Sequence, residues 1–406
     1  MPHPHLMRRL AVAAALPAFA AFALPAAAGA SVANVNGTDL QILDGGGEDN
    51  IVSVSQLADG RLLVKDTRVV SPGQGCVTGF GGAVCSGANR ITALLRGGDD
   101  SLLTTASVPI RYAGGEDDDV YEGGQATGNS HVTFVGGSGR DTASYTTATR
   151  GVTVTKDGRE NDGRAGADRD SIAPDVEDLF GSRHGDSLNG SNDAVTERFT
   201  GLGGDDVLSG NGGPDFFLTG STADGADRMF GGGDRDTVLY DARARPVTVT
   251  LSDGGADDGE AGEGDELRQV EQAAGGSAGD TLKAHPASPV GVQLNGNGGA
   301  DTITGTDADG PGIEERDLLR GGPGRDTITA LDGGDTVIAN DGEVDSVSCG
   351  QGLDAVVADR SAAVLDLMSG CESVQVGTLR LAPSGRSAAE SPPPAEAGAG
   401  RIRVAR

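Results

Sequence analysis

The chain has 406 residues, with 31 lysines and arginines against 60 aspartates and glutamates, and 68 of its positions are glycine. It contains no tryptophan, and aromatic residues make up only 3%. A formal net charge of −29 opposes compaction by self-repulsion. The same charge disfavours nucleic acid and anionic membranes as partners. We therefore expect multivalent cations to help hold the folded chain together. No segment after the N-terminus predicts a transmembrane helix.

Residues 1–30 have the pattern of a secretory signal peptide. A short basic region, Arg8 and Arg9, precedes an apolar run over residues 10–24, and small residues follow. We expect cleavage after Ala30 and a secreted, extracellular protein. An uncleaved N-terminal anchor is the alternative.

All four cysteines follow the signal peptide. An even number of cysteines in an exported chain favours disulfides. Cys76 and Cys85 close a small glycine-rich loop, and Cys349 and Cys371 flank the last repeats. Local pairing, Cys76 with Cys85 and Cys349 with Cys371, is the simplest of the possible connectivities. A zinc site is the alternative, but the spacings do not match a CxxC motif.

A nine-residue repeat organises much of the chain. GGSGRDTAS at 136–144 and GGPGRDTIT at 321–329 share the pattern G-G-x-G-x-D-x-U-x, where U is small or apolar. Such repeats follow one another in the runs 201–239 and 312–357. In the second run, aspartate recurs at the sixth position and an aliphatic residue at the eighth. An acidic tract of low complexity has no reason to keep this spacing.

This nonapeptide resembles that of the hemolysin-type calcium-binding (RTX) repeat family. The resemblance implies that the glycine-rich part is a turn and that the remaining residues form a short strand. It also implies that two nonapeptides make one coil of a right-handed parallel β-roll. We therefore expect an all-β protein, a β-solenoid built from nonapeptide repeats. A short strand with one apolar position can bury only that side chain, so the coils must stack.

Stacking would place aspartates of successive coils in columns about 4.8 Å apart, and like charges at that spacing call for a cation between them. Hard oxygen ligands select Ca²⁺ over transition metals. Because each coil takes two repeats, we expect a calcium ion to bridge repeats n and n+2, with turn carbonyls completing the shell as in the family. The expected bridging pairs are Asp317/Asp335, Asp335/Asp354, Asp326/Asp345, Asp206/Asp227 and Asp215/Asp236. The full set of expected metal ligands is Asp141, Asp206, Asp215, Asp227, Asp236, Asp301, Asp317, Asp326, Asp335, Asp345 and Asp354.

The alternative for these aspartates is that they only cap turns through local hydrogen bonds. Both interpretations stay open for the aspartates outside contiguous repeats, which are Asp49, Asp100, Asp119, Asp186 and Asp280. The insertions at 219–221 and at Ala339 are the places where the repeat register would break first.

A second, larger repeat relates residues 134–188 to residues 229–282. Each copy runs from a calcium-type turn through a VTVT segment and an acidic glycine-rich excursion to a degenerate nonapeptide. The excursions, GRENDGRAGADRD and GGADDGEAGEGDE, look too polar to pack. We expect them to be solvated loops on one face of the solenoid. A further cation at Asp162 and Asp258 is the alternative.

The remaining segments complete the domain organisation. Residues 31–110 contain alternating segments that predict a β-rich N-terminal cap, because the end of a solenoid needs covering. Residues 111–376 are then the calcium-binding β-solenoid. Residues 377–406 are rich in Pro, Ala and Gly and predict a flexible tail.

The sequence contains no HExxH, GxSxG or P-loop motif, and its three lysines, Lys65, Lys156 and Lys283, occur singly in different regions. We therefore expect a protein that is not an enzyme. It would fold on binding Ca²⁺ and act outside the cell as a binding or structural module for a cell-envelope, glycan or protein ligand. The alternative is a polysaccharide-active parallel β-helix enzyme, a lyase or epimerase, which would need basic residues clustered with carboxylates.

Overall fold

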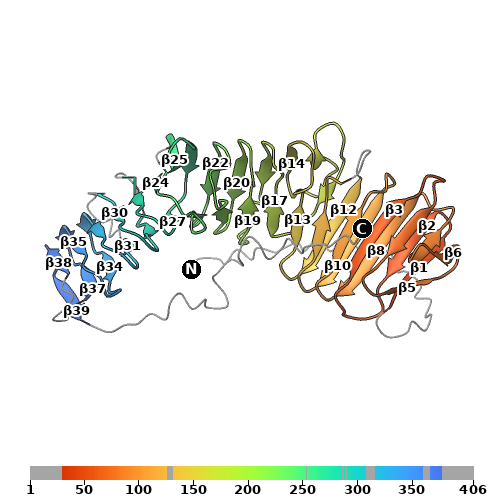
Figure 1. Cartoon of the computed structure of the whole chain (residues 1–406), viewed down its shortest axis with the longest axis horizontal. Coiled ribbons are helices and arrows are strands. Elements are labelled where there is room, and N and C mark those ends of the chain that lie inside the picture. Colours follow the sequence, from red (N-terminus) through yellow and green to blue (C-terminus); the bar gives the residue numbers. More distant parts are fainter. Residues whose placement is uncertain are drawn as a thin grey trace, which may run out of the picture.

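The computed structural model of the chain describes residues 30–125, 131–252, 254–285, 288, 290–307, 316–359 and 366–376. All regular structure in these residues is β-strand, and the strands stack into an elongated, curved solenoid (Figure 1). The predicted all-β solenoid is therefore confirmed. The predicted tail and the predicted signal peptide, apart from Ala30, lie outside the described residues. Within the described part, no helix is long and apolar enough to cross a membrane.

One continuous ladder of parallel strands runs the length of the solenoid. Each strand pairs in register with the strand one coil further on. In order, this first ladder comprises β3 (Ile51–Gln56), β9 (Ser101–Thr104), β11 (Val120–Glu122), β13 (Thr142–Ser144), β17 (Asp178–Phe180), β19 (Arg198–Thr200), β21 (Phe216–Leu218), β23 (Thr237–Leu239), β27 (Gln272–Ala274), β29 (Gln293–Asn295), β31 (Leu318–Arg320), β34 (Thr336–Ala339), β37 (Ala355–Ala358) and β39 (Ser373–Val376).

The second ladder lies opposite and is divided into sections. The first section is β2 (Asp39–Leu43), β8 (Arg90–Gly97), β10 (Ile110–Glu116), β12 (Val132–Ser138) and β16 (Ser171–Ile172). The middle section is β14 (Val152–Val154), β18 (Ser187–Asn189), β20 (Val207–Asn211), β22 (Arg228–Gly232) and β26 (Asp265–Arg268). The last is β24 (Val247–Thr250), β28 (Thr281–Lys283), β30 (Thr302–Thr304), β32 (Thr327–Thr329), β35 (Ser346–Ser348) and β38 (Leu367–Ser369). A minor pair, β33 (Asp332–Gly333) and β36 (Gln351–Gly352), lies in the turns.

Antiparallel strands cover the N-terminal end. β1 (Ala30–Asn36) pairs antiparallel with β2 and parallel with β5 (Val69–Pro72). β4 (Leu62–Lys65) pairs antiparallel with β3 and with β7 (Gly82–Cys85), which forms a hairpin with β6 (Cys76–Gly79). Parallel stacking already begins at β2–β8 and β3–β9, within residues 31–110.

Both predicted disulfides are confirmed. Cys76 is bonded to Cys85 across the β6–β7 hairpin, and Cys349 is bonded to Cys371 beside the last coils. The described residues contain no free cysteine.

The core is a narrow column of apolar side chains between the two ladders. Each short strand turns its middle residue inward, for example Phe199 and Phe217, whose rings stack 5.5 Å apart. Neither predicted point of register loss breaks the ladder. β21 and β23 pair in register on either side of the 219–221 insertion, and Ala339 itself pairs with Ala358.

The prediction that the two acidic excursions are solvated loops is wrong for the parts that insert into the second ladder, although residues 158–161 are exposed. In the first copy β14 pairs antiparallel with β15 (Gly163–Arg164), and β16 then returns in parallel onto β12. In the second copy β24 pairs antiparallel with β25 (Ala256–Glu260), which pairs antiparallel with β26. The excursions thus connect successive sections of the second ladder.

Polar residues can be buried in these excursions because they satisfy one another. In the first copy, Asp162 accepts hydrogen bonds from the backbone N–H of Thr155 at 2.7 Å and of Ile172 at 2.8 Å. The guanidinium of Arg164 donates to both carboxylate oxygens of Asp168. Buried polar groups that keep such partners avoid most of the desolvation penalty.

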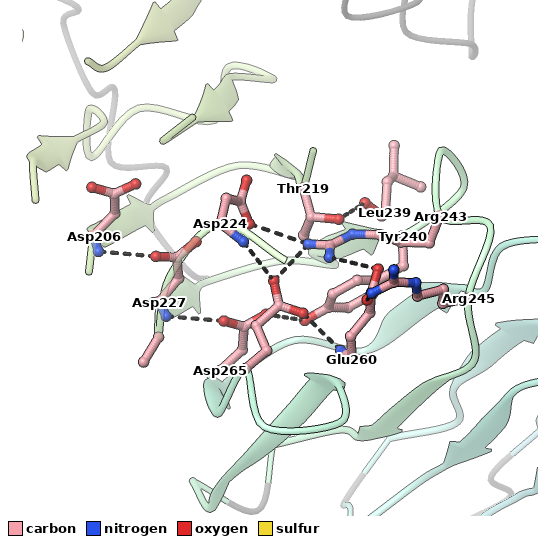
Figure 2. Close-up of polar contacts among 12 residues, drawn as sticks. Asp206, Thr219, Asp224, Asp227, Leu239, Tyr240, Arg243, Arg245, Glu260 and Asp265 are labelled. Carbon is pink, nitrogen blue, oxygen red and sulfur yellow. Dashed lines mark hydrogen bonds and ion pairs between the residues drawn. The ribbon is translucent and has the colours of Figure 1, made fainter. Parts of the chain in front are cut away.

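The second copy uses a different buried cation for the same purpose. Arg243, in the loop after β23, contacts Asp224, Glu260 and Glu263, and Figure 2 shows this cluster beside Tyr240. The hydroxyl of Tyr240 donates to Asp265 Oδ2 at 2.7 Å.

Candidate functional site

Two columns of acidic residues follow the solenoid axis, one at the start of the strands of each ladder. The first column contains Asp100, Asp119, Asp141, Glu177, Glu197, Asp215, Asp236, Glu271, Asp317, Asp335, Asp354 and Glu372. The second contains Asp186, Asp206, Asp227, Asp265, Asp280, Asp301, Asp326, Asp345 and Asp366. Every predicted metal ligand lies in one of the two columns.

The columns are linked by hydrogen bonds from backbone to carboxylate. Over most of each column, the N–H of one acidic residue donates to a carboxylate oxygen of the acidic residue one coil further along. The structure brings together all the predicted bridging pairs in this way, at N···O distances of 2.9 Å for Asp317/Asp335, Asp335/Asp354, Asp326/Asp345 and Asp206/Asp227 and 2.8 Å for Asp215/Asp236.

The second carboxylate oxygen, Oδ2, is buried without a hydrogen-bond partner at most predicted ligands. This holds for Asp141, Asp206, Asp215, Asp236, Asp301, Asp326, Asp335, Asp345 and Asp354, and also for Asp100 and Asp119, for which both interpretations were open. The oxygen lies against the first glycine of the motif. A Cβ at Gly201 or Gly321 would overlap Oδ2 of Asp206 or Asp326, respectively. The leading glycine is therefore required because the aspartate five residues later occupies the space of its side chain.

Burial has a strong effect on the charge of these carboxyls. It raises the pKa of Asp215 and Asp345 to about 8, and that of Asp206, Asp326 and Asp335 to about 7. The hydrogen bonds from backbone N–H groups lower these pKa values but do not offset burial. At neutral pH each buried Oδ2 therefore needs either a proton or a cation as its partner.

The donor chemistry fits a hard cation. The available ligands are carboxylate oxygens and turn carbonyls, which Ca²⁺ prefers. Within the described residues, no group of three or more His, Cys, Asp or Glu side chains is arranged to hold a metal ion. A calcium ion in these columns would therefore depend on carboxylates of two neighbouring coils and on backbone oxygens.

The columns extend beyond the residues that match the nonapeptide. Asp100, Asp119, Asp186 and Asp280 occupy column positions, whereas Asp49 is exposed and accepts the N–H of Asp99 at 3.1 Å in an outer turn. The repeat pattern missed the column residues Glu177, Glu197, Asp265, Glu271, Asp366 and Glu372. An acidic residue directly before a short β-pattern is the signal that would have found them.

A second feature is a depression at the ends of β22, β26 and β28. Arg235, Arg268 and His285 line it together with Asp234 and Glu271. Basic residues and carboxylates that are distant in sequence therefore meet at one place on the surface.

No family model matches the chain, and no curated protein matches it. The resemblance to RTX repeats thus rests on the nonapeptide pattern. The two disulfides indicate an oxidising environment.

The contact between the leading glycine and the aspartate predicts a selective effect of alanine. Gly321→Ala should lower the free energy of unfolding by about 1–3 kcal/mol, because the new methyl group displaces the Asp326 carboxylate. Gly298→Ala is the matched control, since a Cβ there meets nothing closer than Pro323 O at 3.8 Å. Urea denaturation followed by circular dichroism measures both; equal losses would contradict this role of the glycine.

The raised pKa values predict how the metal-free protein responds to pH. An unfolded aspartate has a pKa of about 3.9, and the folded-state values are higher, so the folded chain binds protons more tightly. This contribution to stability is complete below the unfolded pKa and is lost as pH rises through about 7 to 8. The free energy of unfolding should therefore be lower at about pH 9 than at about pH 5.

Circular dichroism of the metal-free protein across this pH range tests the expectation, because β-structure should be retained best at about pH 5 and be lost toward about pH 9. Asp345→Asn should flatten the dependence on pH, whereas Asp241→Asn, which changes an exposed carboxylate outside both columns, should not. Stability that is unchanged or rises toward pH 9 would contradict the prediction.

Proposed function

We propose that this protein is a secreted, calcium-binding β-solenoid that folds on binding Ca²⁺ and acts outside the cell as a binding or structural module. The observation that carries the proposal is the column of buried Oδ2 oxygens that have no hydrogen-bond partner. Such oxygens occur in both columns, at most of the residues that the repeat pattern marks as ligands.

Electrostatics favours a divalent ion over protons as the partner of these oxygens. Carboxylates in successive coils repel one another, and a cation between coils removes that repulsion while keeping the carboxylates charged. Extracellular calcium modules bind with dissociation constants of about 10⁻⁴ to 10⁻³ M. The chain would thus remain largely unfolded before export and fold on reaching calcium outside the cell.

The signal-peptide pattern and the two disulfides support the same location. A metal-stabilised solenoid also accounts for a chain with this much glycine and acidic charge, because ligand binding supplies stability that a narrow apolar column supplies only in part.

A calcium titration of the metal-free protein tests the proposal. At neutral or higher pH, where these carboxyls lose their protons, we expect little β-structure in chelator and a cooperative gain of far-UV circular dichroism on adding Ca²⁺. Each site should add about 2.7 kcal/mol to the free energy of unfolding at a hundredfold excess of Ca²⁺ over its dissociation constant. Magnesium should act more weakly because it demands a tighter, octahedral shell.

Matched variants make the titration specific. Asp326→Asn with Asp345→Asn should raise the calcium concentration at the midpoint and reduce the number of ions counted by native mass spectrometry. The double control Asp241→Asn with Asp257→Asn removes the same charge at exposed positions. It should change neither the midpoint calcium concentration nor the number of bound ions. Identical β content and melting temperature in chelator and in calcium would overturn the proposal.

A second candidate function is the processing of acidic polysaccharides. The depression that gathers Arg235, Arg268 and His285 with Glu271 supports it, because guanidinium groups bind uronate carboxylates and a nearby histidine can move a proton. A screen on acidic glycans, with Arg235→Ala and Arg268→Ala compared with the wild type, tests it. Turnover abolished by both substitutions would establish the activity, and no turnover would exclude it on those substrates.

A further inference from the structure

A buried ion pair lies inside the solenoid at the first excursion. Of the three lysines, Lys65 and Lys283 are exposed, whereas the Lys156 side chain is 0% exposed and contacts Glu197, which is also 0% exposed. Lys156 follows β14 and has a backbone φ of 29°, a left-handed conformation that costs energy for a residue other than glycine. The backbone thus holds the only buried lysine of the described chain in a strained position against one carboxyl.

The Glu197 carboxyl is held by its surroundings as well as by Lys156. The backbone N–H of Ser191 lies 3.0 Å from both carboxylate oxygens. A Cβ at Gly190 would overlap Glu197 Oε2 and lie 2.9 Å from Phe199 Cζ, so backbone and an aromatic ring enclose the carboxyl. The N–H of Glu197 donates to Asp215 Oδ1 at 2.9 Å and fixes its backbone.

The second copy of the larger repeat shows what this place in the fold requires. There, Leu251 is equivalent to Lys156, and Val292 is equivalent to Glu197. These two apolar residues are about as buried as the charged pair. Val292 keeps the backbone contact that Glu197 makes in the first copy, because its N–H donates to Asp317 Oδ1 in the next coil at 2.8 Å. Apolar residues therefore suffice for packing here, and replacing a buried ion pair by apolar residues is often neutral or stabilising. Packing alone does not explain why the first copy has the charged pair.

We propose that Lys156 and Glu197 condense into an intramolecular isopeptide bond between Nζ and Cδ. The ammonium passes a proton to the carboxylate, and the free amine lone pair attacks Cδ. A second proton moves from Nζ to the departing oxygen, the C–O bond breaks, and one water leaves. Ser191 N–H donates to the oxygen that stays as the amide carbonyl and so stabilises the negative charge that develops there during attack. The reaction needs no oxidant or other co-reactant.

The buried setting favours this condensation. Both side chains are 0% exposed, and the exclusion of water prevents hydrolysis of the product. Holding the reacting groups in contact replaces a bimolecular step by an intramolecular one. The bond would join residues separated by 41 positions and tie the first excursion to the next coil. Once formed, it would persist without calcium and, unlike the disulfides, resist reducing agents.

Mass spectrometry of the full chain tests the proposal after its disulfides are reduced. We expect the wild type to be lighter than the mass calculated from its sequence by one water. Tandem spectra should show Lys156 and Glu197 in one branched peptide. Lys156→Arg, which keeps the charge but lacks a nucleophilic amine, should have its full calculated mass.

Two further measurements keep the result unambiguous. The double variant Lys156→Leu with Glu197→Val copies Leu251 and Val292, so it should fold with the wild-type circular dichroism spectrum yet have its full mass. Loss of water at an Asp–Gly sequence would persist in this variant and reverse in mild base, which separates it from the cross-link. A folded wild type with full mass and no branched peptide would overturn the proposal and leave an ordinary buried ion pair.

Discussion

The hydrogen bond from the backbone N–H of one acidic residue to the carboxylate of the next coil is the constraint on which this structure depends. It aligns the coils and turns carboxyls such as that of Asp345 inward, so that Oδ1 is satisfied while Oδ2 is buried without a hydrogen-bond partner. A buried, half-satisfied carboxyl is costly. The fold therefore carries, in many of its coils, a fixed demand for a proton or a cation. The proposed response to calcium follows from that demand.

The nonapeptide was sufficient to predict the most regular features. The leading glycine leaves room for the aspartate carboxylate. The single apolar residue, two positions after the aspartate, suits a short strand that buries one side chain. The pairs in successive coils, such as Asp326 with Asp345, followed from counting two repeats per coil. These features are local or strictly periodic, so one repeat contains nearly all the information that places the next.

The nonapeptide pattern did not predict the structure of the excursions or the column residues that depart from the repeat. Arg164 and Asp168, or Arg243 and Glu263, can be buried only because each finds its partner, and such pairs do not recur with the nine-residue period of the repeat. Glu197 and Glu271 occupy aspartate positions in coils that lack turn glycines. In each case the hydrogen bonds of the folded chain decide where the residue lies, and the polarity of the segment alone does not reveal them.

The buried cation lies at different positions in the two copies of the larger repeat, so segments of the two copies are not interchangeable. Arg164 in β15 and Glu260 in β25 hold equivalent positions, each paired with a valine of the adjoining strand, while Ala148 and Arg243 are equivalent in the preceding loop. Unequal crossing-over between the copies would create hybrids with either two guanidinium groups facing each other or a glutamate facing alanine. We expect such recombinants to fold less stably than the native chain, because each buries a charged group without its partner.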